Sequence, residues 1–151
     1  MRLGLPAAAE RMRDAGIAGV IVPDMPPEAA ASWKRVSAGV DTVFLTAPTS
    51  TDERLAIVAA ASEGFVYCVS ATGITGERDT LALGLADQVE RIRAHTTLPV
   101  AVGFGVSTPA QAAQVAAIAD GVIVGSAIVR RQQDPDQVER FVHQLSEAVS
   151  G

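Results

Sequence analysis

Five short apolar segments alternate with helix-forming segments along this chain of 151 residues. The apolar segments start near residues 20, 42, 65, 99 and 121, so successive starts lie 22 to 34 residues apart. They are rich in β-branched residues and are followed by turn residues, as expected for strands. Strands this apolar on both faces are typical of a parallel sheet that helices cover. The sequence therefore predicts an α/β fold of about five parallel βα units.

Capping signals mark where the intervening helices begin and end. Gly16 is placed to end the first helix with a left-handed residue. Ser50 and Thr108 each stand three residues before a Glu or Gln that would complete a capping box, and Asp134 precedes a proline at the first helical position. The helices predicted in this way span residues 5–15, 28–37, 51–62, 83–94, a stretch from 108, 126–132 and 134–149.

Two glycine-containing segments follow the last two predicted strands, Gly103-Phe104-Gly105-Val106-Ser107 and Gly125-Ser126-Ala127. Glycine lets backbone N–H groups approach an anion with no Cβ in the way. A βα barrel frequently binds phosphate on the loops after its last two strands and a short extra helix, whereas a doubly wound fold places its glycine fingerprint after the first strand. The loop after Val22 contains no glycine before residue 39. The pattern favours a barrel over an open sheet and predicts a phosphate site.

Composition excludes several classes of function. Residues 1–151 are enough for one domain with a core, since 48% of them are hydrophobic. The net charge of −5 and the scattered basic residues are unlike those of a nucleic-acid-binding protein. No apolar stretch reaches the roughly 18 residues of a membrane span, and no signal peptide is evident, so we expect a cytoplasmic protein. Cys68, His95 and His143 occur singly, and no metal site is expected.

Five segments occur in a fixed order along the chain, and these are Val22–Glu28, Phe44–Ser50, Gly64–Gly76, Gly103–Pro109 and Gly121–Ala127. In order and spacing they resemble consecutive motifs of the tryptophan synthase alpha chain family, and Tyr67–Gly76 is the most specific of them. The resemblance implies a (βα)8 TIM barrel. It also implies a lyase of tryptophan biosynthesis, which cleaves indole-3-glycerol phosphate to indole and glyceraldehyde 3-phosphate.

The resemblance also implies roles for individual residues. Tyr67 and Phe104 would line the substrate pocket for the indole ring, although an ordinary core aromatic residue has the same sequence signature. Thr75 would belong to a mobile lid over residues 70–76 and hydrogen-bond a catalytic carboxylate when the lid closes. The phosphate would be bound by backbone amides and one hydroxyl, those of Gly76, Gly105, Gly125 and Ser126.

The expected catalytic carboxylates have no counterpart in this sequence. The family places a glutamate and an aspartate on its second strand and the following loop, and the first strand here matches the family's fourth. Among the acidic residues only Asp24 lies just past a predicted strand, whereas Asp41 and Asp120 precede strands and belong to the opposite rim. We therefore expect an incomplete barrel with no catalytic residue of its own, inactive in isolation.

The resemblance implies partners as well. A tryptophan synthase beta chain would dock on the chain and would carry the pyridoxal phosphate, so no cofactor is expected here. The small-molecule partner would be a phosphate ester, and the open sheet edges favour self-association. Two alternatives remain open from the residues: another phosphate-binding TIM-barrel enzyme, or a non-catalytic phosphate-binding half-barrel that docks a partner.

Overall fold

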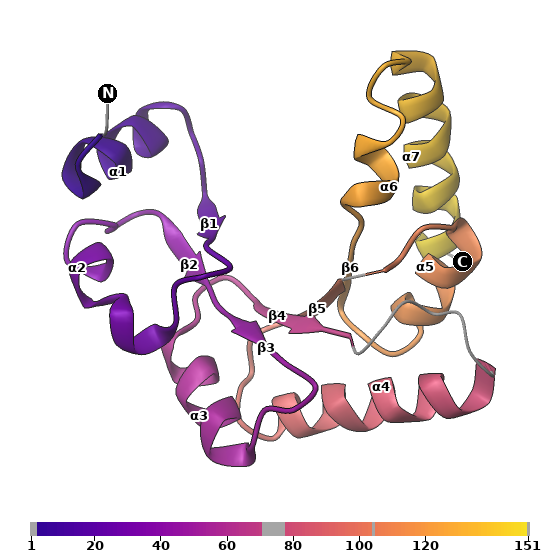
Figure 1. Ribbon diagram of the computed structural model, residues 1–151, viewed down its shortest axis with the longest axis horizontal. Coiled ribbons are helices and arrows are strands. Elements are labelled where there is room, and N and C mark those ends of the chain that lie inside the picture. Colours follow the sequence, from indigo (N-terminus) through magenta and orange to yellow (C-terminus); the bar gives the residue numbers. More distant parts are fainter. Residues whose placement is uncertain (1–2, 71–77, 104, 151) are drawn as a thin grey trace.

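The computed structural model describes residues 3–70, 78–103 and 105–150 (Figure 1). The strands are β1 (Gly19–Ile21), β2 (Asp41–Val43), β3 (Leu45–Thr46), β4 (Val66–Val69), β5 (Val100–Gly103) and β6 (Gly121–Ile123). The helices are α1 (Leu5–Asp14), α2 (Ala31–Lys34), α3 (Asp52–Ala61), α4 (Arg78–Arg93), α5 (Pro109–Ala116), α6 (Ser126–Val129) and α7 (Pro135–Ser150), with a 3-10 turn η1 (Pro27–Ala29) before α2.

Every described strand pair is parallel, and neighbouring strands follow the order of the sequence. β1 pairs with β2, and a second sheet has the order β3-β4-β5-β6. A doubly wound sheet would reverse its strand order at a switch point, whereas a barrel adds each strand beside the previous one. The α/β class and the barrel-type order are therefore confirmed. The strand predicted near residues 42–45 is divided at Phe44, between β2 and β3.

Several helix ends agree with the capping signals. Gly16 is left-handed at φ 71°, and the amide of Ile17 donates to the carbonyl of Met12 at 2.9 Å, which completes a Schellman motif after α1. Thr108 forms a capping box with Gln111 at the start of α5. Asp134 accepts a hydrogen bond at 3.1 Å from the amide of Gln137 at the start of α7.

Other helix predictions were wrong in detail. The helix expected over residues 28–37 is broken into η1 and α2. Pro26 and Pro27 begin a 3-10 turn, in which the amide of Ala29 donates to the carbonyl of Pro26 and the amide of Ala30 to that of Pro27. The cap of α3 is Thr51 rather than Ser50. α4 begins at Arg78 rather than near residue 83, so it is about one turn longer at its start than the predicted helix, and it contains Gly84.

The main core lies on the helix side of the second sheet. Along β4 and β5 the side chains of Val66, Cys68, Val100 and Val102 are fully buried in one cluster with residues of α3, α4, α5 and α7. α3 and α4 lie along one side of this sheet, and α5 to α7 stand at its β6 end (Figure 1). The alternate residues of the strands, Tyr67 among them, therefore face the other side, which is the inner side of a barrel.

A smaller core attaches the N-terminal elements. Ala9 of α1, Trp33 of α2 and Val40 are buried together, and Val20 of β1 packs against them. The indole N–H of Trp33 donates to the hydroxyl of Thr42 at 2.9 Å, so this buried polar group is satisfied. Among the described residues no helix is long and apolar enough to cross a membrane.

Candidate functional site

The two predicted phosphate loops leave the same edge of the sheet. Gly103, at the end of β5, pairs in register with Ile123, at the end of β6. The strands are parallel, so the loop that contains Gly105 and the loop that contains Gly125 both start from their carboxyl ends. Ligands of βα folds bind at this end of the strands. The adjacency that the glycine spacing predicts is thus present.

The loop after β5 is held by one side chain. The side-chain oxygen Oε1 of Gln111 accepts hydrogen bonds from the Ser107 amide at 2.8 Å, the Ser107 hydroxyl at 3.0 Å and the Thr108 amide at 3.2 Å. Gly105 lies in this loop with φ 81° and is exposed. Any residue with a Cβ would be strained in that conformation, so the backbone path here depends on glycine.

The loop after β6 presents open backbone. Gly125 is the N-cap of α6, and a Cβ built on it would meet nothing within 4 Å. Its carbonyl accepts from the amides of Ile128 at 2.9 Å and Val129 at 3.1 Å. Ser126 is exposed, whereas Ala127 is fully buried and anchors the turn. The space beside Gly125 is therefore open to a ligand, and the buried side chain of Ala127 holds the turn in place.

Tyr67 lies on β4, on the face opposite to the buried Val66 and Cys68, and its side chain is partly buried. Burial raises the pKa of its hydroxyl above the usual 10, with a smaller contribution from Cys68, so the phenol stays protonated. A Cβ on Gly103 would lie 2.2 Å from the Tyr67 hydroxyl oxygen and 2.7 Å from Cζ. The ring of Tyr67 thus occupies space that is available only because residue 103 has no side chain.

Sequence reasoning missed this role of Gly103. Glycine inside an apolar strand is itself the available signal, since it often marks a close approach of another group. Gln88 of α4 was also missed. It is 8% exposed, and its side-chain amide donates to the carbonyl of Val69 at 3.1 Å. A polar residue beside the apolar Val89 was the signal, and its bond fixes the end of β4.

Three of the predicted site residues lie outside the described residues. These are Thr75, Gly76 and Phe104. The segment that precedes them is described as far as Ser70, whose amide donates to the Gly103 carbonyl at 3.1 Å. The segment predicted to form a lid therefore follows a strand end that Gln88 and Gly103 hold by hydrogen bonds. The lid itself stays a prediction.

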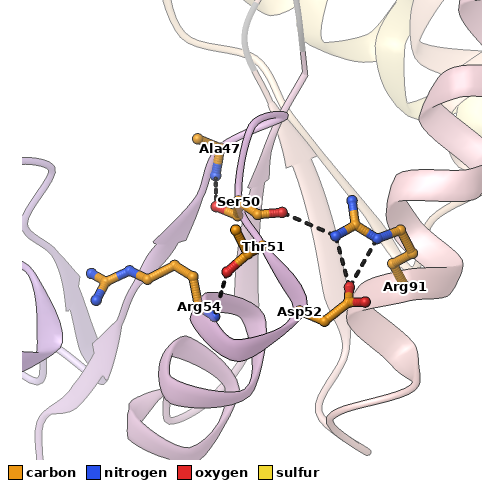
Figure 2. A network of polar contacts seen from close by, with 6 residues as sticks. All are labelled: Ala47, Ser50, Thr51, Asp52, Arg54 and Arg91. Carbon is orange, nitrogen blue, oxygen red and sulfur yellow. Dashed lines mark hydrogen bonds and ion pairs between the residues drawn. The ribbon is translucent and has the colours of Figure 1, made fainter.

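A network of polar contacts fixes the loop after β3 (Figure 2). The hydroxyl of Ser50 accepts from the Ala47 amide at 3.0 Å, and the hydroxyl of Thr51 accepts from the Arg54 amide at 3.3 Å. Ser50 therefore closes the turn, and Thr51 caps α3. The loop uses its hydroxyl groups for its own conformation.

Arg91 of α4 joins this loop from the side, as Figure 2 shows. Its guanidinium donates to the Asp52 carboxylate at 2.7 and 3.0 Å and to the Ser50 carbonyl at 3.0 Å. Two donors on one carboxylate oxygen and a third on a carbonyl orient the fork better than a single contact would. This contact ties the start of α3 to the end of α4.

The described carboxyl groups do not form a catalytic pair. Glu28, in η1, is paired with Arg54, and Asp52, at the start of α3, is paired with Arg91. A general acid needs a raised pKa, but the carboxyl shifts found in the described chain are all downward, at Glu28, Glu53, Asp120 and Asp134. Backbone hydrogen bonds are the main cause in each case.

Asp120 has a structural role, and the two histidines are exposed. Asp120, just before β6, accepts from the Val100 amide at 2.8 Å and from Arg93 at 3.1 Å, so it joins β5, β6 and α4 at the opposite rim. His95 is exposed, and so is His143 on α7, which lies 3.5 Å from Glu147. Within the described ranges no group of three or more potential metal ligands was found.

The comparisons with known proteins agree on one family. The family model for the tryptophan synthase alpha chain matches residues 1–150. The chain is 44% identical over 151 residues to the tryptophan synthase alpha chain of Dehalococcoides mccartyi and covers 97% of itself and 59% of that relative. It is 48% identical over 149 residues to that of Thermobifida fusca, covering 95% of itself and 55% of the relative.

Solved structures give the same result. A structure of Mycobacterium tuberculosis tryptophan synthase superimposes with a TM-score of 0.86 at 42% identity, over 97% of this chain and 57% of that one. Tryptophan synthase subunit alpha from Legionella pneumophila gives a TM-score of 0.81 at 31% identity, over 97% and 57%. The chain thus spans somewhat more than half the length of these four proteins.

Proposed function

The chain belongs to the tryptophan synthase alpha chain family, and from this premise we propose that it binds the phosphate end of indole-3-glycerol phosphate. Cleavage of that substrate to indole and glyceraldehyde 3-phosphate is the lyase reaction of tryptophan biosynthesis. In this proposal the chain supplies the phosphate cradle and part of the indole pocket. The groups that move protons would come from the part of the family's barrel that this chain does not match.

The adjacency of the Gly105 and Gly125 loops carries this proposal. β5 and β6 are paired to their carboxyl ends, and the space beside Gly125 is open. Backbone amides that approach a phosphate this closely can each donate a charge-assisted hydrogen bond, and the Ser126 hydroxyl can add one more. Gly76 would complete the cradle from the segment after β4, as the family resemblance implies.

Tyr67 supports the assignment of the indole end. Its ring lies on the inner face of the sheet, on β4, which is separated from β6 by β5. It presents a flat apolar surface with a protonated hydroxyl. Phe104 would add a second aromatic wall and Thr75 a lid contact. The substrate would lie with its ring over β4 and its phosphate over the ends of β5 and β6.

The chemistry needs a general acid to protonate the ring carbon that carries the glycerol chain, and a carboxylate to stabilise charge at the ring nitrogen. The described carboxyls that have shifted pKa values are all held more acidic than usual. We therefore propose binding without cleavage for these residues by themselves.

Isothermal titration of the chain with indole-3-glycerol phosphate tests the cradle. We expect saturable binding that Gly125→Val abolishes, because the side chain would fill the open space. Gly84→Ala, at an exposed helical position where a Cβ also meets nothing within 4 Å, is the matched control and should bind like the wild type. Binding that is equal in all three proteins would refute the proposal.

We also propose the partners that the family implies. A tryptophan synthase beta chain would bind the loop side of the sheet and would bring its own pyridoxal phosphate, while this chain needs no cofactor. The cytoplasm is the compartment that fits a soluble biosynthetic enzyme. Chromatography with light scattering, with and without a beta chain, would measure that complex and any self-association through the open edges of β1 and β6.

A further inference from the structure

The loop after β6 leads from Gly125 and Ser126 into the single helical turn of α6, and Arg131 lies just after that turn. In a regular helix the amide of Arg131 would donate to the carbonyl of Ala127, four residues back. Here that amide donates to the carbonyl of Ile128 at 2.9 Å, and the guanidinium of Arg131 donates to the Ala127 carbonyl at 2.6 Å. The side chain thus makes the contact that the backbone would make in a regular helix.

The side chain of Arg131 is held in this position by α7, which lies beside α6 (Figure 1). Its guanidinium carbon is 3.9 Å from the centroid of the Phe141 ring, well within the roughly 6 Å of a cation–π contact. Phe141 is buried and belongs to the main core. A helix of one turn has little stability of its own, so the conformation of α6 depends on such outside contacts.

Two peptide groups connect Arg131 to an amide that the proposed function assigns to the phosphate. The guanidinium binds the carbonyl of the peptide group between Ala127 and Ile128, and the N–H of that peptide group donates to the Gly125 carbonyl at 2.9 Å. The Gly125 carbonyl in turn belongs to the peptide group whose N–H is the amide of Ser126. Each hydrogen bond in such a chain polarises the next peptide group, and a charged first donor strengthens the effect. The contact therefore orients the Ser126 amide and makes it a stronger donor.

We propose that Arg131 is a positioning residue for the phosphate, which acts through these two peptide groups on the Ser126 amide and does not itself touch the ligand. The inference rests on the proposed function, because it needs a phosphate at that amide. The neighbouring Arg130 has the same charge and is exposed. A general effect of positive charge on the anion would involve both arginines, whereas the contacts with Ala127 and Phe141 are made by Arg131.

Isothermal titration of the complete chain with indole-3-glycerol phosphate tests this role. Arg131→Met removes the donor and keeps an unbranched stem against Phe141, and we expect it to raise the dissociation constant about tenfold. Arg130→Met removes the same charge one position away and is the matched control. In about 0.15 M salt the charge of an exposed side chain is largely screened, so Arg130→Met should bind like the wild type. Arg131→Lys returns a charged donor without the planar stacking, so its affinity should lie between those of the wild type and Arg131→Met.

The outcomes separate this inference from the proposed function. Circular dichroism and urea unfolding check that each variant keeps its helices and its stability. Weaker binding by Arg131→Met than by Arg130→Met, with a partial return in Arg131→Lys, supports the inference. Equal losses in the two methionine variants, unchanged binding by Arg131→Met, or an Arg131→Lys affinity outside the expected interval overturns the inference while the proposed function stands. A wild type that does not bind the substrate refutes the proposed function, and the inference falls with it.

Discussion

Gly103 lies so close to its neighbours that an added Cβ would collide with them. A Cβ there would lie 2.2 Å from the Tyr67 hydroxyl oxygen, 2.7 Å from Tyr67 Cζ and 3.0 Å from Ile123 Cβ. Ordinary contacts begin near 3.4 Å, so Gly103→Ala must push the ring aside by about 1 Å or deform β5. Overpacking of this kind costs about 1–3 kcal/mol. Alanine lowers the conformational entropy of the unfolded chain relative to glycine, and this offsets about 0.4–1 kcal/mol of the cost.

We therefore expect Gly103→Ala to lower the free energy of unfolding by about 1–2 kcal/mol, measured by urea titration and far-ultraviolet circular dichroism. Tyr67→Leu removes both ring atoms that conflict with the new Cβ. In that background Gly103→Ala should cost at least about 1 kcal/mol less, as a double-mutant cycle would reveal. Gly84→Ala, on an exposed helical face, should stabilise by about 0.5–1 kcal/mol. A neutral Gly103→Ala, or no coupling to Tyr67, would refute the packing that we describe.

The other predictions concern single side chains. Burial raises the pKa of Cys68 to about 11, so iodoacetamide at pH 8 should label it slowly until urea unfolds the chain. The hydrogen bond from the Val100 amide is the main cause of the lowered pKa of Asp120. The stability that this carboxylate contributes is therefore present above about pH 4 and is lost as the pH falls through its lowered pKa. Asp120→Asn should make the free energy of unfolding, measured with urea, depend less on pH in this acidic range. Gln111→Ala should destabilise by about 1–2 kcal/mol and reduce the affinity for indole-3-glycerol phosphate, because it releases the loop after β5.

The sequence was sufficient for the order of elements, because apolar strands and helix caps are local signals. Gly16, Thr108 and Asp134 act where local chemistry predicts. Ser50 was wrong as a cap because the hydroxyl of its neighbour Thr51 could serve equally well, and only the turn made with Ala47 decides between them.

The contacts between distant segments were the part that sequence reasoning could not give. The distance between Gly103 and Tyr67 depends on the register of β4 and β5, and the Arg91 contact joins residues 39 positions apart. A glycine in a strand or a polar residue on a helix indicates that a partner exists. It does not say which segment provides that partner. The loops of Gly105 and Gly125 could be placed together because consecutive parallel strands end at one edge.

The central claim is that these residues bind the substrate of the alpha chain reaction without cleaving it. The most direct test follows indole release from indole-3-glycerol phosphate at protein concentrations that the titration shows to be saturating. We predict bound substrate and no indole from the chain alone. Indole released by the chain alone, lost in Gly125→Val, would contradict the claim.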